Sequence, residues 1–252
     1  MVSFRTNFYL YPVVKHIICT MKNTSYFVIF LFVVLSMNVN AQNQLEDKPF
    51  LDNYRFTRII NGTVFGRNLK IAEVQGTPYL DTKFNIGKIT TSDGAIYGNI
   101  LLRYNAYTDD LEFSSGKDCY NIEPKSMIKR AEFGGSIFGF RSYDLRGTAH
   151  NGFLKILTEG KATLFVRIMI KFLDQEEEKP FMTSKPDRFS DIQKEYFIAI
   201  GDTPAKAVSN KKVLLHLLGE KKAEMESFIS QGKFSAKDED GLRNIVEHFN
   251  AL

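Results

Sequence analysis

Residues 84–104 read FNIGKITTSDGAIYGNILLRY, and this stretch predicts the fold. Asp93-Gly94 at its centre is typical of a hairpin turn, because glycine adopts a positive φ without steric cost and aspartate tolerates it. After the turn, side chains alternate between the two faces of a strand. One face carries Ile96, Gly98, Ile100, Leu102 and Tyr104, and the other carries Tyr97, Asn99, Leu101 and Arg103. The stretch therefore predicts two antiparallel strands joined by a tight turn.

Two further chain reversals follow at short spacing. Thr108-Asp109-Asp110 leads into Leu111–Phe113, and Ser115-Gly116-Lys117 leads into Cys119–Ile122, which ends before Pro124. Aspartate, serine and glycine favour turns because their side chains cap the backbone locally or permit a positive φ. Strands that follow one another through such short turns predict a β-meander.

The second strong element is Ala162–Leu173, ATLFVRIMIKFL. Its apolar residues alternate without a break, although some of them also fit the period of a helix. The density of β-branched residues favours a strand, and Glu195–Ile200 is expected to be the last strand. We therefore expect an antiparallel β domain over residues 54–203, either a meander-type barrel or a sandwich, followed by a helical element over residues 204–252.

The C-terminal region carries the signals of three helices. Asn210 can cap the first helix, and Gly219 and Gly232 are expected to end the first and the second. Ser235, with Asp238 three residues later, resembles the N-terminal cap of the third. The predicted fold class is α+β: an antiparallel β-meander barrel or sandwich followed by a three-helix element.

Met21–Ala41, MKNTSYFVIFLFVVLSMNVNA, has the three parts of a secretory signal peptide. Lys22 is the basic start, an apolar segment follows, and small residues precede a cleavage site after Ala41. Residues 1–41 are thus predicted to be an upstream mis-start plus a signal peptide, and residues 42–53 a flexible start of the mature chain. We expect a periplasmic or extracellular protein whose mature chain has no transmembrane helix.

Charge argues against a nucleic-acid partner. The whole chain has 33 basic and 29 acidic residues, but residues 1–41 contain Arg5, Lys15 and Lys22 and no acid. The predicted mature chain therefore has 30 basic residues against 29 acidic ones and is almost neutral. A basic face large enough to bind nucleic acid is not expected.

No motif commits the chain to a reaction or a cofactor. His150, His216 and His248 lack the spacing of a zinc site. Gly134-Gly135-Ser136 fits neither a nucleophile motif nor a phosphate-binding loop and is predicted to be a glycine-rich β-turn. We expect no metal and no cofactor, and a non-catalytic protein is favoured. The competing enzyme interpretation would require Asp109, Asp110 and Glu112 to converge with Arg103.

Aromatic residues are concentrated in the predicted hairpin region. They could line a ligand pocket, or they could fill the sheet core as cross-strand pairs. The candidate ligand-binding residues are Tyr97, Arg103, Tyr104, Tyr107, Phe113 and Tyr120. The preferred functional hypothesis is an exported, envelope-associated binding or interaction module, whose partner is an unidentified protein or a surface polymer. The alternative is a small apolar-ligand carrier with a β-barrel cavity.

The chain resembles a group of exported, functionally uncharacterised proteins of Bacteroidota-type bacteria. The resemblance rests on Asp93-Gly94-x-x-Tyr97-x-Asn99-x-x-Leu102-Arg103-Tyr104, then Tyr107-x-Asp109 and Leu111-Glu112-Phe113, and on Tyr196–Gly201, Lys211–Leu215, Lys221-Lys222 with Phe228-Ile229, and Leu242–Val246. The leader that ends in Asn40-Ala41-Gln42 fits the same origin. The resemblance implies export, a β domain and a helical C-terminal region, and it brings no catalytic residues.

Overall fold

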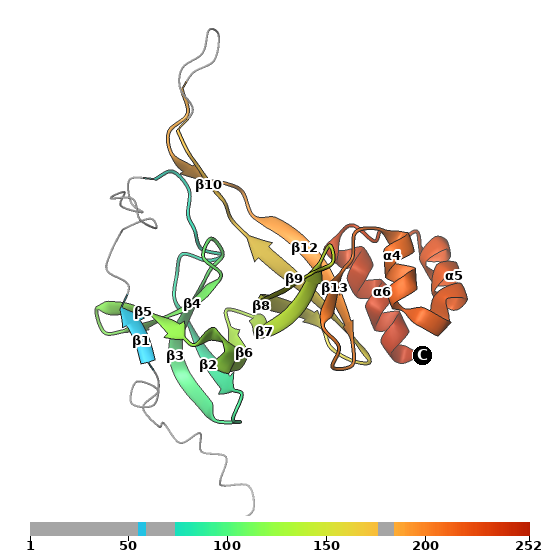
Figure 1. The fold of residues 1–252 in the computed structure, drawn as a ribbon, viewed down its shortest axis with the longest axis horizontal. Helices are drawn as coiled ribbons and strands as arrows, with labels where there is room; N and C mark the ends of the chain where they lie inside the picture. Colours follow the sequence, from blue (N-terminus) through green and yellow to red (C-terminus); the bar gives the residue numbers. More distant parts are fainter. Residues whose placement is uncertain (1–54, 59–73, 176–183) are drawn as a thin grey trace, which may run out of the picture. The chain divides into compact units, whose positions relative to one another are not determined.

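The computed structural model describes residues 55–58, 74–175 and 184–252. The predicted leader at residues 1–41 and the predicted flexible start at residues 42–53 lie outside the described residues. Within the described ranges, the chain is mostly β-strand and ends in three α-helices (Figure 1). This confirms the predicted α+β fold class.

The main sheet has eleven strands, and five of them form a closed ring. The ring closes because β8, the last strand of the sheet, pairs with β7 as well as with β9. The strands β7, β13, β12, β9 and β8 thus make a small barrel. The other six strands extend from β7 as an open sheet, in which β2, β3, β4 and β5 form the predicted meander (Figure 1). In spatial order the strands are β1 (Arg55–Arg58), β5 (Asp118–Glu123), β4 (Asp110–Ser115), β3 (Ile96–Asn105), β2 (Asn85–Thr91), β6 (Ile128–Phe133), β7 (Ser136–Leu145), β13 (Ala205–Ala207), β12 (Gln193–Ile200), β9 (Ala162–Met169) and β8 (Thr148–Thr158).

The β2–β3 hairpin confirms the predicted turn but corrects one part of the predicted faces. Gly94 adopts φ 89° at the turn. Asn99 adopts φ 55°, and the register between the strands shifts nearby, so β3 contains one extra residue. A bulge reverses which face the side chains on one side of it occupy relative to those on the other side. Tyr97 rather than Ile96 therefore lies in the core: Tyr97 is 4% exposed and Ile96 is 46% exposed.

Several strands were not individually predicted. Gly134 and Gly135, with φ 55° and 69°, form the predicted glycine-rich turn and join β6 to β7. The prediction that Glu195–Ile200 is the last strand is wrong, because β13 follows it inside the region predicted to be helical. β13 pairs with β7 in parallel, the exception in an otherwise antiparallel sheet of the described residues. The segment 162–173 is extended as predicted, with β9 followed by β10 (Phe172–Leu173), which pairs with β11 (Arg188–Phe189) in a small separate sheet.

The inside of the ring is filled by side chains from all five strands. Phe197 on β12 is fully buried, and its ring meets that of Tyr143 edge-on, with centroids 5.0 Å apart. Aromatic and aliphatic side chains of this size fill an eight-stranded barrel, and a five-stranded ring is narrower still. The interior cluster consists of Tyr143, Leu154, Ile156, Phe165, Phe197, Ala199 and Ala205.

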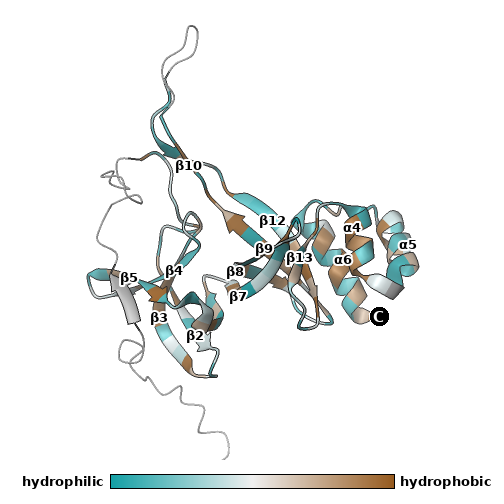
Figure 2. Ribbon diagram, viewed as in Figure 1, coloured by the Kyte–Doolittle hydropathy of each residue, from teal (hydrophilic) through white to brown (hydrophobic). Residues whose placement is uncertain are grey.

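The opposite face of β9 packs against the helices. Leu164 and Val166 belong to the same hydrophobic cluster as Leu242, Ile245 and Val246 of the last helix. Figure 2 shows that α4 and α6 each carry both hydrophobic and hydrophilic residues, as expected for helices that cover a core on one side. The helices are α4 (Lys211–Leu217), α5 (Lys222–Gly232) and α6 (Glu239–Ala251), with short 3₁₀ turns η2 (Lys125–Met127) and η3 (Gly219–Lys221).

Helix caps agree in part with the prediction. Asn210 caps α4, because its Oδ1 accepts a hydrogen bond from the amide of Val213 at 3.0 Å. Asp238, rather than Ser235, caps α6, because its Oδ1 accepts from the amide of Gly241 at 2.8 Å. The left-handed residue at the end of α5 is Lys233, one position after the predicted stop. None of the helices in the described ranges is long and apolar enough to cross a membrane.

Candidate ligand-binding site

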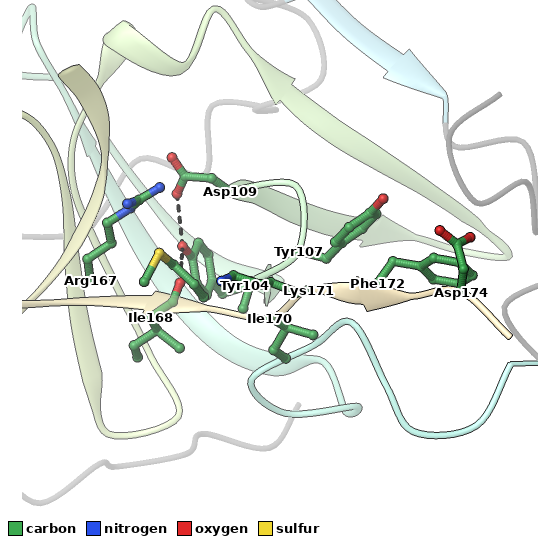
Figure 3. Close-up of a pocket in the computed structure, with 11 residues that line it drawn as sticks. Tyr104, Tyr107, Asp109, Arg167, Ile168, Ile170, Lys171, Phe172 and Asp174 are labelled. Carbon is green, nitrogen blue, oxygen red and sulfur yellow. Dashed lines mark hydrogen bonds between the residues drawn. The ribbon is translucent and has the colours of Figure 1, made fainter. Parts of the chain in front are cut away.

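A pocket of about 530 Å³ lies between the loop that joins β3 to β4 and the C-terminal half of β9 (Figure 3). β8 pairs with β9 only as far as Val166, so beyond this point the loop takes the place of a neighbouring strand. The amide of Ile170 donates to the carbonyl of Ala106 at 3.1 Å, which fixes the loop against the strand. Polar and aromatic lining residues include Tyr104, Tyr107, Asp109, Arg167, Lys171 and Phe172.

The loop has a defined shape because its backbone is bonded internally. Asn105 Oδ1 accepts hydrogen bonds from the amides of Tyr107 and Thr108, each at 3.2 Å. Lys125 Nζ donates to the carbonyl of Asp109 at 2.7 Å and forms an ion pair with Asp110 Oδ1 at 2.6 Å. These contacts hold the wall of the pocket in place without a ligand.

Asp109 is a half-buried carboxylate at one end of this pocket. Its Oδ1 accepts a hydrogen bond from the hydroxyl of Tyr104 at 2.8 Å, and the amide of Phe153 lies 3.1 Å and 3.2 Å from its two oxygens. A side chain at Gly152 would force the carboxylate of Asp109 to move, because a Cβ atom would lie 2.5 Å from Asp109 Oδ2. Burial raises the pKa of Asp109 above its usual value, and the hydrogen bond from Tyr104 opposes this rise.

Arg167 lines the same end of the pocket from β9 (Figure 3). Its Nη1 atom donates to Glu195 Oε2 at 3.3 Å, and its guanidinium lies 5.5 Å from the ring centroid of Tyr143. Although Arg167 and Asp109 both line the pocket, the described residues contain no ion pair between them within 4.0 Å. The pocket thus contains a guanidinium and a carboxylate that do not form an ion pair with each other.

The raised pKa of Asp109 predicts how the free energy of unfolding depends on pH. The folded protein raises this pKa, so folding favours the protonated acid, and the stability that Asp109 contributes is lost as the pH rises from the unfolded pKa through the folded one. Asp109→Asn should therefore increase the free energy of unfolding at pH 7, and the difference from the unmodified protein should vanish at a pH below the unfolded pKa. Asparagine tolerates the φ of 56° at this position. Urea unfolding of both proteins from pH 3 to pH 7 measures the difference; an Asp109→Asn variant that is less stable at pH 7 would contradict the prediction.

Arg103 belongs to a different cluster, built around the buried carboxylate of Glu112. Its Nε and Nη2 atoms lie 3.2 Å and 2.5 Å from Glu112 Oε2, and Asn105 Nδ2 donates to Glu112 Oε1 at 2.9 Å. The guanidinium also lies 3.5 Å from the ring centroid of Tyr79 and 4.2 Å from that of Phe84. Burial is the main cause that raises the pKa of Tyr79 to about 12. Glu112 accepts from both Arg103 and Asn105, and Arg103 also packs on two aromatic rings, which is typical of a structural ion pair.

Of the three carboxylates in the competing enzyme interpretation, Glu112 meets Arg103, whereas Asp109 and Asp110 have other partners. Glu112 pairs with Arg103, Asp110 pairs with Lys125, and Asp109 accepts from Tyr104. Three acids close in sequence therefore serve three separate contacts.

The remaining predicted ligand-binding residues divide between pocket and core. Tyr104 and Tyr107 line the pocket. Tyr97 is buried, and the rings of Phe113 and Tyr120 stack across two paired strands with centroids 5.1 Å apart. Arg167 was missed as a candidate, and the available signal was a charged residue inside the apolar alternation of residues 162–173.

An apolar surface lies on the exposed face of the β2–β3 hairpin. Ile86 and Leu101 are directly opposite each other across the two strands and are 71% and 40% exposed. Ile96 lies on the same face because of the bulge in β3. Beside them, Lys88 on β2 and Glu132 on β6 form an ion pair at 3.2 Å. We call Ile86, Ile96 and Leu101 the hairpin face.

Nothing in the described ranges gathers three or more His, Cys, Asp or Glu side chains into a potential metal site. Comparison with known proteins yields no matching family model, no matching curated protein and no matching solved structure.

Proposed function

We propose that the protein is an exported, non-catalytic binding module of the cell envelope, in the periplasm or outside the cell. Export is supported by the leader at Met21–Ala41, which has a basic start, an apolar segment and a small-residue cleavage site. Its partner is another protein, bound at the hairpin face.

The observation that carries this proposal is the exposure of Ile86 opposite Leu101. Removing large aliphatic side chains from water is favourable, so a pair left exposed on one sheet face is a candidate interaction surface. The ion pair of Lys88 and Glu132 beside it supplies the polar rim that protein interfaces have around an apolar centre. The exposed residues are aliphatic, whereas a surface polymer made of sugars is bound mainly by stacking on aromatic rings.

The carrier hypothesis has less support. An apolar-ligand carrier needs an enclosed apolar cavity, but Phe165 and Phe197 fill the ring interior together with Tyr143. The pocket beside Asp109 is lined by charged groups as well as by apolar ones, which does not suit a wholly apolar ligand.

Site-specific photo-crosslinking in the host tests the partner. A photo-reactive residue at Leu101 should give one discrete cross-linked protein, and the cross-link should be lost when Ile86→Asp is added. Ile86 is 71% exposed, so the added charge should leave the fold intact. Ile192, 44% exposed and outside the hairpin, is the matched control position and should give no such product.

Four results would overturn parts of the proposal. Equal products from positions 101 and 192 would contradict the hairpin face, and cross-links to glycan would replace the protein by a polymer. A lipid mass retained in native mass spectrometry would favour the carrier. N-terminal sequencing should give a chain that starts at Gln42, and an uncleaved cytoplasmic chain would contradict export.

A further inference from the structure

We propose that the pocket between the β3–β4 loop and β9 binds a free α-amino acid with a large apolar or aromatic side chain. Arg167 would bind its carboxylate, Asp109 would bind its ammonium group, and Tyr107 and Phe172 would contact its side chain. The site is separate from the hairpin face and does not depend on the proposed function.

The lining of the pocket carries charges of both signs. Arg167 and Lys171 are cationic and Asp109 and Asp174 are acidic; Arg167 and Asp109 lie at one end, and Asp174 lies near Phe172 at the other (Figure 3). A single anion or cation would meet one attractive and one repulsive group. A zwitterion satisfies both, and this matching of opposite charges is how a site rejects ligands of the wrong charge.

Arg167 lies close to Asp109. Its charge opposes the rise in the pKa of Asp109 that burial causes, so the two groups are near enough to interact through space. They nevertheless form no ion pair within 4.0 Å in the described part of the chain. Figure 3 places both at the same end of the pocket, as the two charges on one α-carbon require.

Asp109 is already oriented by the protein, and Arg167 keeps hydrogen-bond donors for a ligand. Asp109 is oriented by the hydroxyl of Tyr104 and the amide of Phe153, so it is fixed before a ligand arrives. Arg167 is held by Glu195 through a single contact at 3.3 Å, and a guanidinium has five N–H donors. Most of its donors therefore remain for a carboxylate.

The opposite end of the pocket carries two aromatic rings. Tyr107 and Phe172 lie there, away from Arg167 and Asp109 (Figure 3). Both rings pack edge-on against Phe189, with centroids 5.6 Å and 5.7 Å apart, which fixes their positions. The volume of about 530 Å³ falls within the range of small-molecule sites. The rings of Tyr107 and Phe172 match the side chain of such an amino acid, and Arg167 and Asp109 match its two charges.

Calorimetric titration of the protein purified from its host tests the proposal with three probes: L-phenylalanine, 3-phenylpropanoate and 2-phenylethylammonium. L-Phenylalanine should bind saturably with one site per chain. Each probe that lacks one charge should bind about tenfold more weakly or worse, because a hydrogen bond to a charged group contributes roughly 1.5–3 kcal/mol.

Variants then assign each charge to its residue. Asp109→Asn and Arg167→Gln should each weaken L-phenylalanine binding about tenfold. Asp109→Asn should not weaken binding of 3-phenylpropanoate, and Arg167→Gln should not weaken binding of 2-phenylethylammonium, because each change removes the charge that repels that probe; loss of folding could not produce this result. Arg141→Gln is the matched control, because Arg141 lies on β7 and lines another pocket.

The proposal fails if L-phenylalanine, L-leucine and L-methionine all show no saturable binding to the unmodified protein. It also fails if 3-phenylpropanoate binds as tightly as L-phenylalanine, since the site would then recognise a simple anion. Ile86→Asp should leave binding unchanged, so this result and the result of the cross-linking experiment can be distinguished.

Discussion

Replacing Phe197 by alanine is expected to lower the free energy of unfolding by about 3–5 kcal/mol. Phe197 is fully buried inside the five-stranded ring, where its ring packs against Tyr143. The ring is closed by hydrogen bonds on every side, so its strands cannot collapse into the space that the phenyl group leaves. Both the lost burial and the remaining cavity therefore reduce stability.

Urea unfolding, followed by far-UV circular dichroism, measures this effect. Phe197→Leu keeps most of the volume and should lose under about 1.5 kcal/mol. Phe172→Ala is the control for removing a phenyl group at a half-buried position, and it should have a smaller effect than Phe197→Ala. If Phe197→Ala lost less than Phe172→Ala, the ring interior would not be the packed core described above.

Replacing Glu112 by alanine is expected to lower the free energy of unfolding by a similar amount, about 3–5 kcal/mol. Glu112 is 2% exposed and is the acceptor for both Arg103 and Asn105. Its removal leaves a guanidinium between Tyr79 and Phe84 with its carboxylate partner missing. An unpaired buried charge costs far more than an exposed ion pair contributes.

A double-mutant cycle separates the pair from its surroundings. The Arg103→Met, Glu112→Met double variant should be more stable than the Glu112→Met single variant, because it removes the stranded charge along with the pair. Glu224→Ala is the matched control, since Glu224 and Lys221 form a pair in which both side chains are 49% exposed. That change should alter stability by under about 1 kcal/mol, and an equal loss at Glu224 would contradict the structural role of Glu112.

Short-range sequence signals were sufficient to predict the hairpin turn, the extended segment and the helix start to which they belong. Asp93-Gly94 correctly predicted a hairpin, and the alternation in residues 162–173 correctly predicted an extended segment rather than a helix. Asn210 correctly predicted a helix start. Each of these signals acts between residues a few positions apart, and such short-range effects can be read from one sequence.

The parts that were missed depend on contacts between distant residues. Closure of the ring needs β7 to pair with β13, and nothing in Ala205–Ala207 identifies its partner. The bulge at Asn99 arises where β3 must match β2, so the residue alone gives no sign of it. The pocket has the same origin, because Asp109 and Arg167 come from a loop and a strand that only the folded sheet brings together.

The pairing of β7 with β13 also determines when the fold can be completed during synthesis. Tyr143 pairs with Ala205, and the amide of Ala162 donates a hydrogen bond to Asn250 Oδ1 at 2.7 Å. The strands β7 and β9 therefore gain these contacts only when β13 and α6 have been synthesised. Contacts this distant in sequence form slowly. Until they form, β7 and β9 have open edges that can pair with other chains. The chain is therefore expected to be most prone to aggregation while β7 and β9 have formed and β13 and α6 are not yet in place.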